Sequence, residues 1–379
     1  MTPLAPLTLY IHVPWCVQKC PYCDFNSHAL QGELPEQRYL EALIADLGEQ
    51  RDRVAGRSVE AVFFGGGTPS LLSPAAVARL IDAVAGSLNL SASAEITLEA
   101  NPGTVDAGRF AGFRAAGVNR LSLGVQSFDD GMLHALGRIH DARGAHEAVV
   151  CAMNHFDNVN LDLMIGLPRQ TVAEACADIE TALRYNPPHL SCYTLTLEPN
   201  TPFHHRPPVL PDAETQEQLE AEVYRRLTVA HYDNYEISAW ARNGMMARHN
   251  LNYWEFGDYL GIGAGAHAKL SGAWGVERQR RPRHPTAYMR AVEAGEAVEE
   301  SWTVKLCDLP FEFMMNALRL RRGVDRRLYE QHTGQSSSVF AGLVRKLEDE
   351  GWLERDATRW VATSHGQRFL NDLLQRFLP

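Results

Sequence analysis

Residues 16–23 read Cys-Val-Gln-Lys-Cys-Pro-Tyr-Cys, and this short stretch is the most informative part of the chain. Its C-x3-C-x2-C spacing places three thiolates on one loop, and no fourth cysteine is close enough in sequence to complete the set. A four-iron, four-sulfur cluster on Cys16, Cys20 and Cys23 would therefore keep one iron without a protein ligand. That open iron predicts that a small molecule binds the cluster directly.

Two other uses of the cysteines compete with the cluster. A zinc site of the Cys3His type would take its fourth ligand from His12 or His28, although zinc ligands usually come as two separated pairs. A disulfide framework is disfavoured because the chain has seven cysteines, an odd number. The other four cysteines are scattered and are predicted to be small core residues: Cys151, Cys176, Cys192 and Cys307.

The composition is that of an ordinary globular protein. With 379 residues, the chain is long enough for about two or three domains. Its net charge of −10 argues against a general nucleic-acid binder, which needs a basic face for phosphate contacts. Because no apolar run approaches the roughly 18 residues of a membrane span, we expect no transmembrane segment and a cytoplasmic location, where thiols stay reduced.

Short β-branched runs alternate with longer helical patterns over the first two thirds of the chain. Strands are predicted at residues 7–13, 61–64, 95–99, 120–125, 159–164 and 191–197. Helices are predicted at residues 36–53, 74–87, 107–116, 144–155, 171–184 and 215–230. Six βα units are too few for a closed eight-stranded barrel, so the pattern predicts an α/β fold with an open, curved (β/α)6 parallel sheet.

Glycine and polar residues follow the predicted strands. The cysteine loop comes after the first strand, Gly-Gly-Gly-Thr-Pro (65–69) after the second and Glu-Ala-Asn-Pro (99–102) at the end of the third. Gln126 and Asp162 belong to the ends of the fourth and fifth strands. Each of these residues alone is equally well explained as a turn or a helix cap. Together they predict a ligand site, because ligands of open α/β sheets bind at the carboxyl ends of the strands.

These motifs, in this order, resemble the radical S-adenosylmethionine (SAM) proteins related to oxygen-independent coproporphyrinogen III dehydrogenase. The resemblance covers nearly the whole chain and includes LEANP (98–102), GVQSF (124–128), LGRIH (136–140) and DLMIGLP (162–168). It implies a partial TIM barrel of the radical SAM type, a [4Fe-4S] cluster on the three cysteines, and SAM bound to the open iron. The positions that the resemblance assigns to SAM are Gly66, Gly67 and Thr68 at the methionine end, and Tyr10, Tyr22, Glu99, Gln126, Arg138 and Asp162 along the rest of the pocket.

Two features separate this chain from the dehydrogenase. That enzyme has a further cysteine two positions after its third, where this chain has Phe25, and it has a long extension before the cluster. Both differences resemble a sister group of haem chaperones within the same family. We therefore expect the protein to bind haem and transfer it to apo-acceptors such as membrane respiratory enzymes, and not to oxidise coproporphyrinogen. The rival functions are that of the radical dehydrogenase and that of a haem sensor or storage protein. The sequence does not decide whether SAM is cleaved or only bound, or whether the protein forms a homodimer.

A second motif, Arg-His-Asn-Leu-Asn-Tyr-Trp (248–254), matches the H-N-x-x-Y-W motif of those chaperones. The resemblance implies that His249 ligates haem iron, with Tyr253 and Trp254 offering flat apolar surface to the porphyrin. Composition alone favours a loop histidine beside two core aromatic residues. Because the cysteine loop lies far away in sequence, we expect changes at His249 to leave the cluster intact.

The remainder of the chain is expected to be connecting and C-terminal structure. The glycine-rich stretch 261–267 lacks the context of a dinucleotide-binding motif and is predicted to pack against the barrel mouth, while the basic stretch 278–285 is predicted to be a solvated linker, with haem propionates or anionic lipid as alternative partners. Helices at 311–320, 339–350 and 367–377, with a hairpin of 353–355 and 360–362, resemble a winged helix serving as a cap or docking domain. The expected domains are 1–235, the partial barrel; 236–304, the haem-motif segment and linker; and 305–379.

Overall fold

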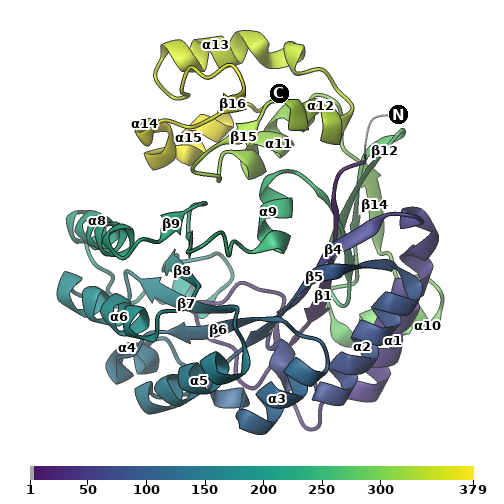
Figure 1. The fold of residues 1–379 in the computed structure, drawn as a ribbon, viewed down its shortest axis with the longest axis vertical. Coiled ribbons are helices and arrows are strands. Elements are labelled where there is room, and N and C mark those ends of the chain that lie inside the picture. The colour runs from purple at the N-terminus through teal and green to yellow at the C-terminus, as the bar shows by residue number, and fades with distance from the viewer. Residues whose placement is uncertain (1–3) are drawn as a thin grey trace.

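The computed structural model describes residues 4–379 and contains one curved, twelve-stranded sheet with helices along its convex side (Figure 1). The strand order is β14-β13-β12-β11-β1-β4-β5-β6-β7-β8-β10-β9. Within the part of the chain that is described, β14 and β9 do not pair, so the barrel stays open. A C-terminal helical part lies on the far side of α9 (Arg248–Trp254), at the opening between the two edges of the sheet (Figure 1).

The main sheet combines a parallel centre with antiparallel edges. Its parallel strands are β11 (Asp258–Ile262), β1 (Leu7–Val13), β4 (Ser58–Gly66), β5 (Asn89–Ala100), β6 (Arg120–Gln126), β7 (Val159–Ile165) and β8 (His189–Thr194). Its antiparallel strands are β12 (His267–Gly272), β13 (Gly275–Arg280) and β14 (Glu300–Thr303) at one edge, with β10 (Ala239–Ala241) and β9 (Asp233–Asn234) at the other.

Helices connect and cover the strands. The longer ones are α1 (Glu36–Gln50), α2 (Pro74–Ser87), α3 (Ala107–Ala115), α5 (Ala142–His155), α6 (Val172–Tyr185), α8 (Ala213–Val229) and α10 (Pro285–Glu293). Short elements are η1 (Arg51–Val54), η2 (Pro69–Leu71), η3 (Pro102–Thr104), α4 (Asp130–Ala135), α7 (Pro202–His205) and α9 (Arg248–Trp254). Several of these helices begin at a side chain that caps a free N–H group, as at α6, where Thr171 and Glu174 form a capping box.

Strand β1 shows why the inside of this barrel is polar. Its alternate residues Leu7, Leu9, Ile11 and Val13 are buried in the core between sheet and helices. Since successive side chains point to opposite faces of a strand, the residues between them face the concave side. Two of them contact α9 inside the barrel: Tyr10 packs against His249, and Thr8 Oγ1 accepts from Asn252 Nδ2 at 3.2 Å. The concave side is therefore free to carry functional groups while the convex side supplies the apolar core.

The fold class predicted from the sequence is confirmed, since the six predicted strands correspond to β1, β4, β5, β6, β7 and β8. The sequence missed a seventh parallel strand, β11, which pairs with β1 on the side opposite β4. The first two residues of the stretch 261–267, which the sequence analysis predicted to pack against the barrel mouth, belong to this strand. The run Asp-Tyr-Leu-Gly-Ile contains one glycine, is followed by another and has a single β-branched residue, so local propensity gave only a weak strand signal.

The predicted solvated linker at 278–285 is also wrong. Arg278 and Arg280 belong to β13, and the Arg281 side chain is 0% exposed, with its Nη2 donating to Asp46 Oδ1 at 3.0 Å. Tyr288 also donates to Asp46, which ties α1 to α10. The basic composition hid a buried ion pair whose acidic partner lies far away in sequence. The core prediction likewise fails for Cys307, whose side chain is exposed, whereas Cys176 is buried as expected.

The C-terminal part has its own apolar core. Its elements are α11 (Leu309–Ala317), β15 (Val324–Asp325), α12 (Arg327–Thr333), η4 (Ser337–Phe340), α13 (Ala341–Asp349), β16 (Arg359–Trp360), α14 (Ser364–Arg368) and α15 (Leu370–Gln375). The expected hairpin is present as the antiparallel bridge between Leu353 and Ala362.

The predicted helix 367–377 is divided at Phe369 into α14 and α15. Among residues 4–379, no helix combines the length and the apolar character needed to cross a bilayer.

Candidate functional site

The cysteine loop leaves β1 at its carboxyl end and is closed by backbone hydrogen bonds. Residues Trp15–Cys16 (β2) pair with His28–Ala29 (β3), and the Leu30 N–H donates to the Cys16 carbonyl at 2.8 Å. The Lys19 ammonium donates to two carbonyls of the same loop. The three thiols Cys16, Cys20 and Cys23 are free and partly exposed. The fold therefore presents all three predicted ligands on one short, pinned loop.

The surroundings of the thiols fit an iron–sulfur cluster. Burial raises the pKa of Cys16 and of Cys23, although a hydrogen bond to Ser27 opposes this shift in both. The Arg138 guanidinium approaches Cys20, with Nη1 3.6 Å from Sγ. Iron binding deprotonates thiols, and a cation beside them stabilises the resulting negative charge. The cluster, when bound, would supply an electron and one open iron for SAM.

His12 is not free to act as the fourth ligand of a zinc site. Its Nε2–H donates to the Asn26 carbonyl at 2.8 Å, so its Nδ1 accepts from the Tyr10 hydroxyl at 3.0 Å. Burial lowers the pKa of His12 to about 4, which keeps the imidazole neutral. With both ring nitrogens engaged, the side chain connects Tyr10 in the barrel to Asn26 beside the cysteine loop. The zinc alternative through His12 is therefore wrong.

The glycine loop after β4 lies directly against the cysteine loop. The Gly67 and Thr68 N–H groups donate to the Val13 and Trp15 carbonyls, both at 2.7 Å. A Cβ atom on Gly67 would lie 2.5 Å from the Trp15 carbonyl oxygen, and one on Gly66 would lie 2.6 Å from the His12 ring. Gly66 also has a φ of +116°, a conformation that favours glycine. These glycines thus position the cysteine loop, a role that the sequence analysis did not assign to them.

Two predicted SAM residues, Glu99 and Asp162, are carboxyls on the concave side. Glu99 Oε2 accepts from the Gly66 N–H at 3.2 Å, and burial, followed by the charge of Asp162, raises the pKa of Glu99 to about 8. Asp162 accepts from Ser122 at 3.0 Å and from Asn160 at 2.8 Å, and burial raises its pKa as well. A cationic ligand beside these carboxyls would stabilise the ionised form that burial disfavours.

The remaining predicted SAM residues lie at the same edge of the sheet. Arg138 joins β5 to β6, because its Nη2 donates to Asn101 Oδ1 at 2.6 Å and to the Gly124 carbonyl at 2.8 Å. Gln126 ends β6 with a φ of 71°, an uncommon conformation for a residue with a side chain. Tyr22 packs on a small apolar cluster that includes Met132. The fold therefore gathers these residues around the carboxyl ends of the parallel strands.

His249 lies inside the barrel and is 3% exposed. Its ring centroid is 5.0 Å from that of Phe63, 6.0 Å from that of Tyr10 and 4.8 Å from that of Tyr253. Burial, followed by the charge of Arg120, lowers the pKa of His249 to about 3, and its Nδ1 has no hydrogen-bond partner in the part of the chain described. The imidazole is thus neutral, the form that binds metals. The structure also brings it against Tyr10, a predicted SAM residue.

The two aromatic residues of the second motif face different parts of the molecule. Tyr253 packs against Tyr259 of β11, with ring centroids 4.2 Å apart and the ring planes tilted by 36°. Trp254 packs against the C-terminal core, and the Arg319 guanidinium lies 4.3 Å from the centre of its ring. They do not form one flat surface with His249, so that expectation is wrong. Helix α9 is instead the joint between barrel and C-terminal part (Figure 1).

Some residues that position the site escaped sequence analysis. Asn26 donates from Nδ2 to the carbonyls of Ala264 and Arg283, both at 2.9 Å, which fixes the cysteine loop to the turn after β11 and to the segment before α10. Glu95 accepts from the Arg248 N–H at 2.9 Å and holds the start of α9. Each residue acts on a segment more than one hundred positions away. For Asn26, the only sequence signal of such a role was its position three residues after Cys23. For Glu95 the sequence offered none.

Fold and cysteine loop define the chain as a radical SAM protein with an open, partial barrel. The Radical SAM superfamily profile matches residues 10–182, and the HemN C-terminal domain profile matches residues 305–369. A solved structure, coproporphyrinogen III oxidase (HemN) of Escherichia coli, described as a radical SAM enzyme, has a TM-score of 0.83 at 23% identity, covering 98% of this chain and 90% of that one. That likeness shows that the two chains share a fold.

Full-length relatives define the family more narrowly. The heme chaperone HemW of Escherichia coli is 48% identical over 380 residues, covering 100% of both chains, and HemW of Haemophilus influenzae is 46% identical over 384 residues, covering 100% of this chain and 99% of the relative. A bovine protein named radical S-adenosyl methionine domain-containing protein 1, mitochondrial, is 36% identical, covering 98% of this chain and 87% of its own length. The chain belongs to the HemW family.

Proposed function

We propose that the protein is a haem chaperone that carries a [4Fe-4S] cluster and SAM, binds haem, and transfers it to apo-acceptor proteins such as respiratory enzymes. The observation that carries this proposal is the full-length identity of 48% with a protein named heme chaperone. It is supported by a buried, neutral His249 on the helix that joins the two parts of the molecule. Cytoplasmic location and a homodimer remain predictions.

In this proposal Cys16, Cys20 and Cys23 hold the cluster. Gly66, Gly67 and Thr68 lie next to the cysteine loop, where the methionine end of SAM would meet the open iron. Glu99 and Asp162 would face the cationic part of SAM, because a positive charge favours the ionised form of each carboxyl. Arg138 would balance the charge of the cluster or of the SAM carboxylate.

The haem step is proposed to use the His249 imidazole as an axial ligand. In the structure Tyr10, Phe63 and Tyr253 surround that ring, so iron reaches it only when these side chains or α9 move. Such movement fits a chaperone, which must release its haem. The second candidate function, a coproporphyrinogen dehydrogenase, is favoured by the likeness to HemN alone.

Anaerobic reconstitution tests the proposal. The reconstituted protein is loaded with haem, mixed with an apo-acceptor, and the acceptor's absorption spectrum is followed. We expect the acceptor to gain haem and coproporphyrinogen III to stay unchanged under reducing conditions with SAM. Turnover of coproporphyrinogen would instead identify an enzyme. Tight haem binding without transfer would identify a sensor or store.

The division of the chain at residues 235 and 304 also remains a prediction. The strands β11 to β14 extend the barrel sheet beyond residue 235, whereas residues 305–379 include most of a second apolar core. Limited proteolysis checks the boundary: cleavage near residue 304 that releases a stable C-terminal fragment would support it.

A further inference from the structure

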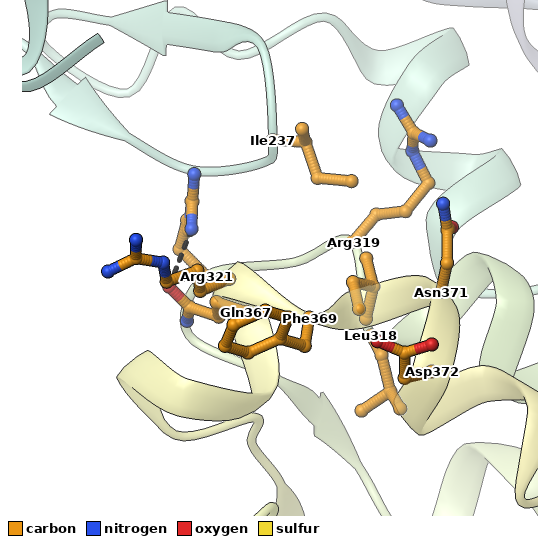
Figure 2. Close-up of a pocket in the computed structure, with 10 residues that line it drawn as sticks. Ile237, Leu318, Arg319, Arg321, Gln367, Phe369, Asn371 and Asp372 are labelled. Carbon is orange, nitrogen blue, oxygen red and sulfur yellow. Dashed lines mark hydrogen bonds between the residues drawn. The ribbon is translucent and has the colours of Figure 1, made fainter. Parts of the chain in front are cut away.

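A cleft between barrel and C-terminal part lies on the side of α9 that carries Trp254. Its volume is about 420 Å³, and the residues that line it come from the β9–β10 turn, the segment after α11 and the α14–α15 region (Figure 2). Pockets for small organic molecules range from roughly 300 to 1,000 Å³. The cleft is thus large enough to hold a substantial part of such a ligand.

The cleft is cationic although the chain as a whole is acidic. Arg319, Arg321 and Arg368 line it, against a single carboxylate, Asp372. Arg319 faces Glu236 at 3.6 Å, and Arg368 pairs with Glu217 outside the cleft at 3.1 Å. Arg321 donates to the neutral Gln367 and forms no ion pair among residues 4–379. Burial lowers the pKa of Arg321, although Tyr224 and the charge of Glu236 oppose this shift.

Two apolar side chains stand beside these charges. Ile237 is 38% exposed and Phe369 is 42% exposed, and Figure 2 shows both at the cleft. Phe369 lies at the break between α14 and α15, which leaves its ring outside the C-terminal core. A planar apolar body next to two or three guanidinium groups matches a ligand that carries carboxylates on one edge of an aromatic ring system.

We propose that this cleft binds the carboxylate edge of a tetrapyrrole, with Arg321 as the principal anion partner and Phe369 against the macrocycle. This inference rests on the proposed haem function and adds a site to it. Arg319, which lines the cleft, contacts Trp254 at the C-terminal end of α9, and His249 lies near the N-terminal end of the same helix. This helix therefore connects the cleft to His249. Carboxylate binding in the cleft does not need iron, which separates it from ligation by His249.

Metal-free protoporphyrin IX tests the site, because it has both carboxylates and no iron. The full-length protein is titrated and porphyrin fluorescence is followed. We expect Arg321→Gln to weaken binding about ten-fold or more, since a charge-assisted hydrogen bond is lost. Arg321→Lys should retain most of the affinity. The matched control is Arg355→Gln, an exposed arginine of the same C-terminal part that pairs with Asp349, and it should change nothing.

If Arg321→Gln does not fold, two variants at exposed positions replace it. We expect Arg368→Gln and Phe369→Ala each to weaken porphyrin binding several-fold. Unchanged affinity in these variants, or an equal loss in Arg355→Gln, overturns the inference. Capture of a glutamate-rich peptide in place of the porphyrin also overturns it. Normal haem transfer by Arg321→Gln with unchanged porphyrin affinity refutes the cleft alone, whereas Arg321-dependent porphyrin binding without any haem transfer refutes the chaperone function alone.

Discussion

The cysteine loop and the surroundings of His249 are two walls of one barrel, that is, two regions that border its inside. They differ in how accessible they are to a ligand. The three thiols are partly exposed on a loop held by backbone hydrogen bonds, whereas the His249 ring is enclosed by aromatic side chains. Tyr10 touches both walls, through His12 on one side and His249 on the other. The comparison indicates that the thiols are more accessible to a ligand than the His249 imidazole is, because aromatic side chains must move before haem iron can reach that ring.

The largest effect is expected at the cysteine loop. Exchange of Cys16, Cys20 or Cys23 for Ser leaves two thiolates, and a cluster held by two protein ligands is labile, so iron per chain should fall from about four to below one. Iron and sulfide analysis after anaerobic reconstitution measures this. Cys307→Ser is the matched control, because that thiol is exposed and far from the loop in sequence. Full iron content in any of the three variants would contradict the assignment.

A nearly equal loss is expected at the glycine loop. Gly67→Val brings a Cβ atom within 2.5 Å of the Trp15 carbonyl oxygen, so the cysteine loop must shift. We expect a cost of about 3 kcal/mol or more in unfolding free energy, together with loss of iron and of SAM binding. Gly86→Val is the control, because its Cβ meets no atom within 4 Å. Retained iron with lost SAM binding would show that the loop contacts only the ligand.

These two cases show what the sequence can and cannot predict. Spacing alone predicted the three cysteines as cluster ligands, which stays a prediction, and β-branched periodicity located six of the seven parallel strands, because both signals are local. The glycines were recognised, but their contact with Trp15 depends on the pairing of β1 with β4. The burial of Arg281 by Asp46 and the enclosure of His249 depend on segments more than one hundred residues apart. Such pairings leave no local pattern, so the sequence predicted a linker and an open aromatic wall.

A smaller and pH-dependent effect is expected at Glu99. Its pKa is about 8 in the folded protein against an ordinary value of 4.5, so between these values the folded state keeps a proton that the unfolded chain has lost. Stability therefore falls as pH rises through this window. Asp162 contributes in the same direction, and Arg120 opposes the shift at Glu99. Thermal melts of ligand-free protein from pH 5 to 8 should show a steeper decline for the natural chain than for Glu99→Gln.

Binding of SAM provides the converse measurement for Glu99. A cationic ligand favours the ionised carboxylate, so SAM affinity should rise between pH 6 and 8.5 in the natural protein and stay flat and weaker in Glu99→Gln. Equal pH profiles for the two proteins would place Glu99 outside the pocket.

The smallest structural effect is expected for His249→Phe, which preserves an aromatic ring against Phe63 and Tyr10. Because volume and stacking are nearly conserved, the unfolding free energy should change by less than about 1.5 kcal/mol, and iron content should stay full. His249→Ala, in contrast, leaves a cavity and should cost about 2–4 kcal/mol. Both variants remove the imidazole, so both should alter the haem absorption bands that report axial ligation and slow transfer to an acceptor.

An unaltered haem spectrum in His249→Phe would assign the ring to packing alone. Loss of the cluster in His249→Phe would show that Tyr10 and His12 transmit changes at α9 to the cysteine loop, and that the two walls are one unit.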